Sequence, residues 1–178
     1  MAGVKVYAQY SFARNGQEVE GNERQNDRYA GLGLSFNQGA FSTALVVDSV
    51  LYNYKATSQK ASLGVTWGAS YDFSVAKLFA QAQYGKHENK FGLISDIESV
   101  ITKDEGLKGF DVSLGVTGPV CGGTLYAQAS YLDSKSDSEV FGTDVRADKV
   151  KAKNWGIGLG YSYLFSKRTY AYTYASYN

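Results

Sequence analysis

Hydrophobic and polar residues alternate along most of the chain. Between Ala61 and Tyr71 every odd position is apolar, and every even position is Ser, Gly or Thr. A repeat of two residues is the period of a β-strand, and no helical period fits this segment. The pattern predicts nine strands and no helix. The alternating segments are residues 4–13, 28–37, 41–51, 60–72, 75–86, 108–117, 124–133 and 149–164 and the tyrosine-rich end of the chain.

In two segments the alternation does not assign every residue clearly to one face. In residues 75–86, Phe79 falls on the otherwise polar side. In the last segment, Tyr170, Tyr172 and Tyr174 fit either a pore wall or an interface, and the alternation alone does not choose their face.

The connections between the segments alternate in length. Short turns are predicted near residues 38, 73, 121 and 166, and Pro119 opens the third of them, where no ladder donor is needed. Residues 14–27, 87–107 and 134–148 form long charged loops, and residues 52–58 form an intermediate one. Strands of about ten residues with short turns at one end and long loops at the other are typical of outer-membrane barrels. The predicted fold is all-β, an antiparallel up-and-down transmembrane β-barrel in one domain, residues 1–178.

Three features favour lipid outside the barrel over a soluble barrel with an apolar interior. The apolar faces carry no charge over the strand centres, where Lys or Arg would cost roughly 2–4 kcal/mol in a bilayer. The polar faces hold Gly, Ser, Thr, Gln, Lys and Asp, which line water well and pack poorly. Aromatic residues end the apolar faces, as in interfacial girdles. They are Tyr10, Phe12, Phe36, Phe41, Trp67, Tyr71, Tyr84, Phe110, Tyr131, Trp155, Tyr161 and Tyr163.

Composition and charge exclude several other classes. Eighteen Lys and Arg against 17 Asp and Glu give a net charge of +1, so nucleic acid is not expected as a partner. The single cysteine and the single histidine allow neither a disulfide scaffold nor a Cys/His zinc site. No apolar run is long enough for a helical membrane span, and Met1 is not followed by an export signal.

The polar faces supply the candidate functional residues. In a barrel they would line a passive, hydrated path whose selectivity follows its width and wall charge, and mixed signs predict weak ion selectivity. The competing interpretation is the wet side of a sheet without a channel. The candidate pore-lining residues are Lys5, Gln9, Asp48, Lys60, Lys77, Gln81, Gln83, Asp111, Tyr126 and Gln128.

No catalytic, cofactor or metal site is predicted. His87 begins a long loop with no nucleophile or carboxylate motif beside it, and Cys121 is a thiol in a short turn. Arg28 and Arg168 are interpreted as solvated charges at strand ends. The acidic residues 133–144 depart from a calcium loop at the positions that need an acidic ligand and a glycine.

Two glycine pairs carry a G-x-G spacing. They lack the third glycine and the following helix of a dinucleotide site. Gly31, Gly33, Gly156 and Gly158 are therefore interpreted as small lumen-facing residues beneath large neighbours.

Several segments resemble the general trimeric porins of Gram-negative bacteria, of the β-proteobacterial type. They are VKVYAQYSFA, RYAGLGLSFNQGAFSTALVV, KASLGVTWGASYDFSVAKLFAQAQYGK, LGVTGPVCGGTLYAQASYLDSK and IGLGYSYLFSKRTYAYTYASYN, the last with the turn Phe165-Ser166-Lys167-Arg168-Thr169. The resemblance implies a 16-stranded barrel of roughly 320 residues, of which these nine strands are the C-terminal half. The family's first-half strands, its constriction loop and arginines, and its last strand with a terminal aromatic residue have no counterpart here.

The resemblance implies an outer-membrane porin that works as a homotrimer, with lipid outside and small hydrophilic solutes and ions diffusing passively inside. It implies no enzyme activity. The alternative is a complete small outer-membrane barrel that acts as an adhesin or structural protein through its long loops.

Overall fold

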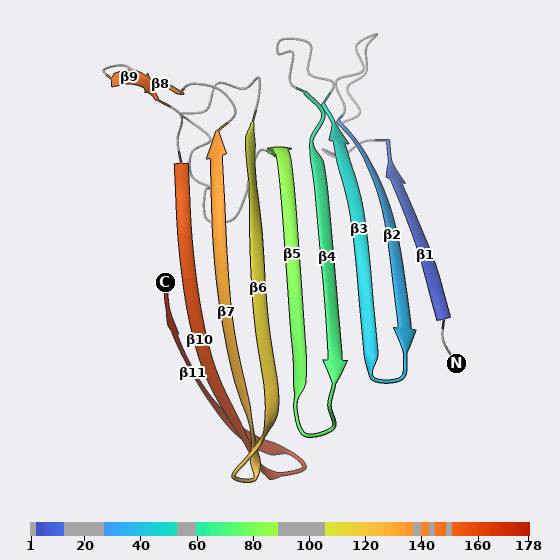
Figure 1. Cartoon of the computed structure of the whole chain (residues 1–178), viewed down its shortest axis with the longest axis vertical. Helices are drawn as coiled ribbons and strands as arrows, with labels where there is room; N and C mark the ends of the chain where they lie inside the picture. Colours follow the sequence, from blue (N-terminus) through green and yellow to red (C-terminus); the bar gives the residue numbers. More distant parts are fainter. Residues whose placement is uncertain are drawn as a thin grey trace.

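A computed structural model describes residues 3–12, 27–52, 60–88, 106–136, 140–142, 145–148 and 151–178. Within these residues every regular element is a β-strand (Figure 1). The strands are β1 Gly3–Ser11, β2 Arg28–Gln38, β3 Phe41–Leu51, β4 Leu63–Asp72, β5 Lys77–Glu88, β6 Leu107–Val120, β7 Gly123–Ser136, β8 Val140–Gly142, β9 Val145–Asp148, β10 Lys151–Ser166 and β11 Thr169–Tyr177.

Nine of the described strands form one antiparallel up-and-down sheet. Its order is β1 to β7 followed by β10 and β11, so each strand pairs with its neighbour along the chain within this sheet. The sheet is curved, and β1 and β11 are its two edges, so it is not closed among the described residues (Figure 1). The predicted all-β, up-and-down architecture is confirmed, and the curved sheet is consistent with part of a barrel wall.

The four predicted short turns all lie at one end of the sheet, called here the short-turn end (Figure 1). The β6–β7 turn consists of Cys121 and Gly122, with φ of 48° and 78°. Positive φ at both central residues is the geometry of a two-residue hairpin turn that follows the strand twist. The Tyr161 hydroxyl donates to the Val120 and Cys121 carbonyl oxygens at 3.0 and 3.2 Å, which ties this turn to β10.

Several strand boundaries differ from those predicted, and two of them bear on the fold. β4 begins at Leu63 and not at residue 60. β6 runs through Pro119, which pairs with Thr124 in β7. The pairing of β5 with β6 ends at Thr117, so beyond it β6 pairs only with β7. Pro119 is tolerated there because an edge position needs no backbone N–H on its unpaired side.

The segment 134–148, predicted as a loop, contains the end of β7 and the small β8–β9 pair. β-structure in this segment was missed because the alternation there is broken by charged and small residues. The long-loop predictions for 14–27, 52–58 and 87–107 fall largely outside the described residues.

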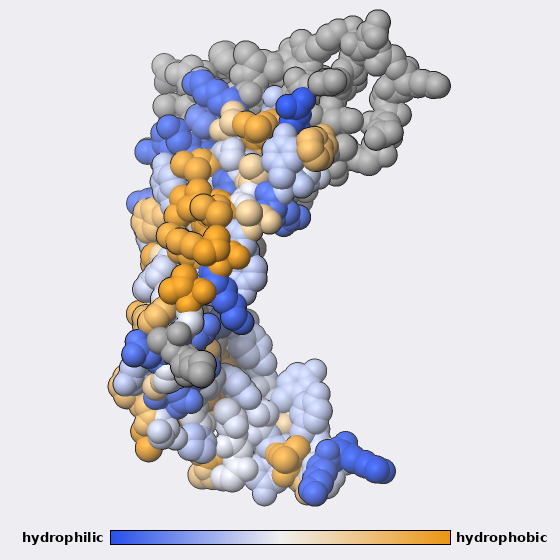
Figure 2. All heavy atoms as spheres, turned by 90° about the vertical axis from the view of Figure 1, so that its right-hand side faces the viewer, coloured by the Kyte–Doolittle hydropathy of each residue, from blue (hydrophilic) through white to orange (hydrophobic). Residues whose placement is uncertain are grey.

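The sheet encloses no packed core in the part of the chain described. Val50 and Leu107 are the only buried hydrophobic side chains there, whereas large apolar residues are exposed along every strand of the main sheet. Figure 2, which faces the β1 edge, shows hydrophobic residues gathered over the middle of this side and hydrophilic residues toward both ends. No helix in the described ranges has the length and apolarity to cross a membrane.

Candidate functional site

The cross-strand register keeps the two faces of the sheet separate over the main sheet. The side that carries Lys5, Gln81 and Ser113 is called the polar face. One row across it reads Lys5, Ser35, Ala44, Gly68, Gln81, Ser113, Ser130 and Gly156. The next row toward the short-turn end reads Gly3, Asn37, Ser42, Ser70, Phe79, Gly115, Gln128, Gly158 and Ser176. Apart from Phe79 these residues are small or polar, so this face suits water rather than a packed core.

The opposite side, called the apolar face, is almost uniformly hydrophobic. One row across it reads Val6, Leu34, Leu45, Trp67, Ala82, Val112, Tyr131 and Trp155. Thr43 is a polar residue on this face. Its hydroxyl donates a hydrogen bond of 2.9 Å to the Gly68 carbonyl oxygen and accepts one of 3.0 Å from Trp67 Nε1. Satisfied polar groups and exposed apolar side chains are what a face in contact with hydrocarbon needs.

Aromatic side chains meet near the ends of the apolar face. Phe110 and Tyr131 lie 6.0 Å apart between ring centroids, and Asp133, the cross-strand partner of Phe110, forms an ion pair of 3.2 Å with Lys153. Near the short-turn end, Tyr71 and Phe73 lie 4.6 Å apart. These ring contacts agree with the predicted interfacial girdles, where aromatic rings lie at headgroup level.

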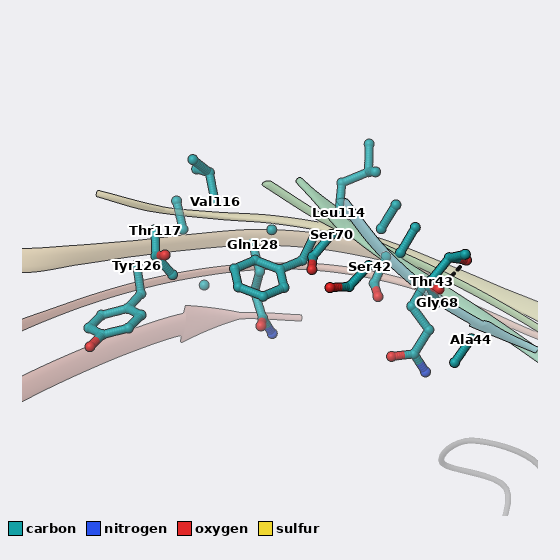
Figure 3. A pocket seen from close by; sticks show the side chains of 18 of the residues that line it. Ser42, Thr43, Ala44, Gly68, Ser70, Leu114, Val116, Thr117, Tyr126 and Gln128 are labelled. Carbon is teal, nitrogen blue, oxygen red and sulfur yellow. Dashed lines mark hydrogen bonds between the residues drawn. The ribbon is translucent and has the colours of Figure 1, made fainter. Parts of the chain in front are cut away.

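The polar face is hollowed at its middle. The hollow has a volume of about 560 Å³ and is lined from β2 to β11. Tyr126 and Gln128 point to this side of the sheet, whereas Leu114 and Val116 point to the other (Figure 3). No charged side chain is among its described lining residues. The hollow therefore offers hydroxyl, amide and aromatic groups along one continuous wall.

The structure brings most of the predicted pore-lining residues to the polar face. Lys5, Gln9, Asp48, Lys77, Gln81, Gln83, Asp111, Tyr126 and Gln128 all lie in its rows. Lys60 lies before the first residue of β4, outside the sheet register. Because β4 starts three residues later than predicted, Lys60 is placed at the rim and not along the wall.

The charged members of this set are distributed over both halves of the face. Lys77 pairs across strands with Asp72 and Thr117 near the short-turn end, and its Nζ lies 5.2 Å from the Phe79 ring centroid. Asp48 and Asp111 lie farther from that end. The Asp48 carboxylate lies over Gly64, where an added Cβ would come within 2.7 Å of Oδ1. Opposite charges are therefore spread along the wall without forming a single-sign cluster.

A sequence model of a protein family described as Gram-negative porin matches residues 1–178, the whole chain. This chain belongs to the Gram-negative porin family. The searches of curated proteins and of solved structures found no match. The family is one of outer-membrane channel proteins, which fixes the localisation as the outer membrane and gives a physical reason for the two faces.

The face of the last tyrosines, left open by the alternation, is settled by the register of this porin. Tyr174 pairs with Gly160, Tyr172 with Ser162 and Tyr170 with Leu164, which places the three tyrosines on the polar face. Period two does not distinguish the faces of a strand that lacks a clearly polar side. The glycines of β10 would have been the signal, because they leave room for large cross-strand partners on that face.

The four glycines of the G-x-G pairs are expected to be small residues beneath large neighbours, and the structure agrees at three of them. Tyr29 covers Gly31, Asn178 covers Gly156 and Tyr174 covers Gly158, each within a distance that a Cβ would violate. Gly33 lies beside Tyr7 and Val46 at ordinary contact distance.

The remaining candidates carry no catalytic arrangement in the described residues. His87 is near the end of β5 and not in a loop as predicted. Its φ is 55°, and the pairing of β5 with β6 shifts in register there. A bulge places an extra residue in the strand, and this local irregularity hid the strand end from the alternation. Cys121 is exposed in its turn. No group of three His, Cys, Asp or Glu side chains in the described ranges could hold a metal ion.

Proposed function

We propose that this porin forms a water-filled channel for passive diffusion of small hydrophilic solutes and ions, and that it works as a homotrimer. The observation that carries the proposal is the separation of the two faces across the main sheet. Most large apolar side chains point to one side of the sheet, and mainly small or polar side chains point to the other. Such a wall separates lipid from water.

The charges on the polar face support weak ion selectivity. Lys5 and Lys77 lie toward the short-turn end, and Asp48 and Asp111 lie toward the other. An ion that crosses the channel meets both signs in turn, so neither anions nor cations gain a continuous favourable path. The pore-lining roles of these residues and of Gln9, Gln81, Gln83, Tyr126 and Gln128 belong to this proposal, and so does a place for Lys60 at the rim of the channel.

Adjacent residues of β5 provide a matched test of the channel. Gln81 is on the polar face and Ala82 is on the apolar face, in line with Trp67. In a Cys121→Ser background, Gln81→Cys and Ala82→Cys are each purified from the outer membrane and placed in planar lipid bilayers. A membrane-impermeant, charged thiol reagent is added to the water.

We expect stepwise ion currents from both variants. The reagent should change the step size for Gln81→Cys and leave Ala82→Cys unchanged, because only the first thiol faces water. Absence of current steps would refute the channel. Equal modification of both variants would refute the assignment of the faces.

The same experiment separates the channel from an adhesin or structural barrel. A barrel that acts only through its loops needs no continuous water path, so it would insert in the bilayer without conducting. The family match favours the channel.

A further inference from the structure

One region of the polar face gathers four tyrosines, whereas the exposed rings of Tyr7 and Phe79 on the same face are on separate strands. Tyr126 on β7 and Tyr170, Tyr172 and Tyr174 on β11 form a group toward the short-turn end, called here the tyrosine strip. Their side chains are exposed, Tyr174 to 58% and Tyr172 to 75%. Contact between water and the apolar surface of an aromatic ring is unfavourable. A water-filled wall therefore has no need of four exposed rings, and their presence requires another reason.

Two glycines of β10 hold the Tyr174 ring against the sheet. An added Cβ at Gly160 would lie 3.3 Å from Tyr174 Cδ2, and one at Gly158 would overlap the Tyr174 hydroxyl. The ring therefore extends along β10 over both positions. Tyr174 is still 58% exposed and helps to line the hollow.

The neighbouring rings extend this surface. Tyr126 lines the same hollow, and its hydroxyl lies 3.4 Å from the Ser162 hydroxyl, close enough for either to donate. Tyr170 and Tyr172 are stacked, with centroids 6.2 Å apart and planes at 28°. Tyr126 and Tyr174 are on strands that have β10 alone between them, so their Cα atoms lie about 10 Å apart. The strip therefore leads from the short-turn end into the hollow.

The polar groups that line the hollow are neutral. Lys77 is in the same cross-strand row as Tyr126 and Tyr174, on the strand next to Thr117, and it is not among the lining residues. Gln128, Ser113 and Thr117 line the hollow beside the rings, and no charged side chain is among its described lining residues. A solute that matches this wall has a flat apolar face for the rings and uncharged hydroxyl groups at its rim for the amide and hydroxyl side chains. A pyranose sugar has this form, because its C–H groups cover the ring faces and its hydroxyl groups surround them.

We propose that the tyrosine strip is a binding site for pyranose sugars on their way through the channel. The inference rests on the proposed channel function and adds a solute class to it. Weak binding of this kind raises the local concentration of a solute and still lets it leave.

The test compares two neutral polyols in single-channel recordings of the porin. Maltose has two pyranose rings, and mannitol is an open chain with hydroxyl groups and no ring face. We expect maltose to produce transient, concentration-dependent reductions of the current, and mannitol to produce only the change expected from viscosity. Tyr174→Ser should weaken the maltose effect by about three- to tenfold, the range of an aromatic contact.

Two further variants separate binding from folding. Gly158→Ala places a methyl group where the Tyr174 hydroxyl lies, so it should lift the ring and weaken the maltose effect while keeping the tyrosine. Tyr7→Ser removes an exposed tyrosine from the polar face at the other edge of the sheet, and it should leave the maltose effect unchanged.

The outcomes keep the two proposals distinct. A porin without ion conductance refutes the channel itself. A porin that conducts but responds equally to maltose and mannitol, or responds equally with and without Tyr174, refutes the sugar site and leaves the channel intact. Blocking by an aromatic amide but not by maltose would also overturn the sugar assignment.

Discussion

A lysine in place of Leu114 tests whether the apolar face lies in hydrocarbon. Leu114 is on β6 and is 67% exposed. The apolar stretch of this strand runs from Phe110 to Val120, and each residue adds about 2.5 Å of height at a strand tilt of roughly 40°. The stretch is therefore about 25 Å tall, the height of the apolar band of such barrels. Leu114 lies within about 3 Å of its centre.

At this depth the penalty for a lysine is near its maximum. A cationic side chain at the midplane costs about 2–4 kcal/mol. This lowers the equilibrium constant for folding into the bilayer roughly 30- to 900-fold. The neighbouring variant Ser113→Lys adds the same charge to the same strand but on the polar face. Its expected effect is within about 0.5 kcal/mol, as for an ordinary surface substitution.

The assay is reversible unfolding by urea from lipid vesicles. Trp67 and Trp155, both on the apolar face, report insertion through their fluorescence. A difference of about 2 kcal/mol or more between Leu114→Lys and Ser113→Lys is the expected result. Equal free energies of unfolding for the two variants would mean that both faces meet a similar solvent, and the reasoning about lipid would fail.

Three further outcomes follow from particular residues. Ser62 is 2% exposed and its hydroxyl accepts a hydrogen bond of 2.9 Å from the Val50 N–H, so Ser62→Ala should lower the free energy of unfolding by about 1–3 kcal/mol in the same urea assay. Cys121 is exposed at the short-turn end, which faces the periplasm in such barrels, so a membrane-impermeant maleimide should label it in cells only after the outer membrane is permeabilised. Asp48→Asn with Asp111→Asn removes two negative charges from the polar face and leaves its lysines in place, so the reversal potential in a salt gradient should move toward anion preference, and an unchanged potential would place both carboxylates off the ion path.

The faces of most strands could be predicted from the sequence because one side of each strand is clearly polar. In β4 the even positions hold only Ser, Gly and Thr between Leu63 and Tyr71, and the register with β3 and β5 keeps these positions on the polar face. Antiparallel pairing with short turns fixes the partner of each residue, so one correct face determines that of the next strand. The alternation could therefore predict that most of the pore-lining candidates share one face of the sheet.

The strand ends near the long loops could not be predicted in the same way. The alternation stops being informative where Gly106 and His87 both have positive φ and the β5–β6 register shifts. An added Cβ at Gly106 would come within 2.7 Å of the His87 carbonyl carbon, so this position is limited by a close approach of two backbones. The alternation within one segment carries no information about a contact between residues so far apart along the chain.

The tyrosine strip shows what a comparison of neighbouring strands adds to the alternation within one. On β10 the large residues Leu159 and Tyr161 are on the apolar face, and glycines hold the polar face. On β11 the sizes are reversed, since Leu159 pairs with Ala175 and Gly160 pairs with Tyr174. Each pair joins a large residue to a small one, as packing of cross-strand neighbours requires.

This reversal places aromatic rings on both faces of one hairpin for different physical reasons. Tyr161 and Tyr163 are on the apolar face near the short-turn end, where a ring gains from the boundary between lipid and headgroups. Tyr172 and Tyr174 face water, where the same ring gains nothing until a solute covers it. Gly158 and Gly160 leave room for the Tyr174 ring close to the sheet. A wall that needed only width would hold serine at these positions. The tyrosines are therefore the residues of this wall whose chemistry points to a particular solute.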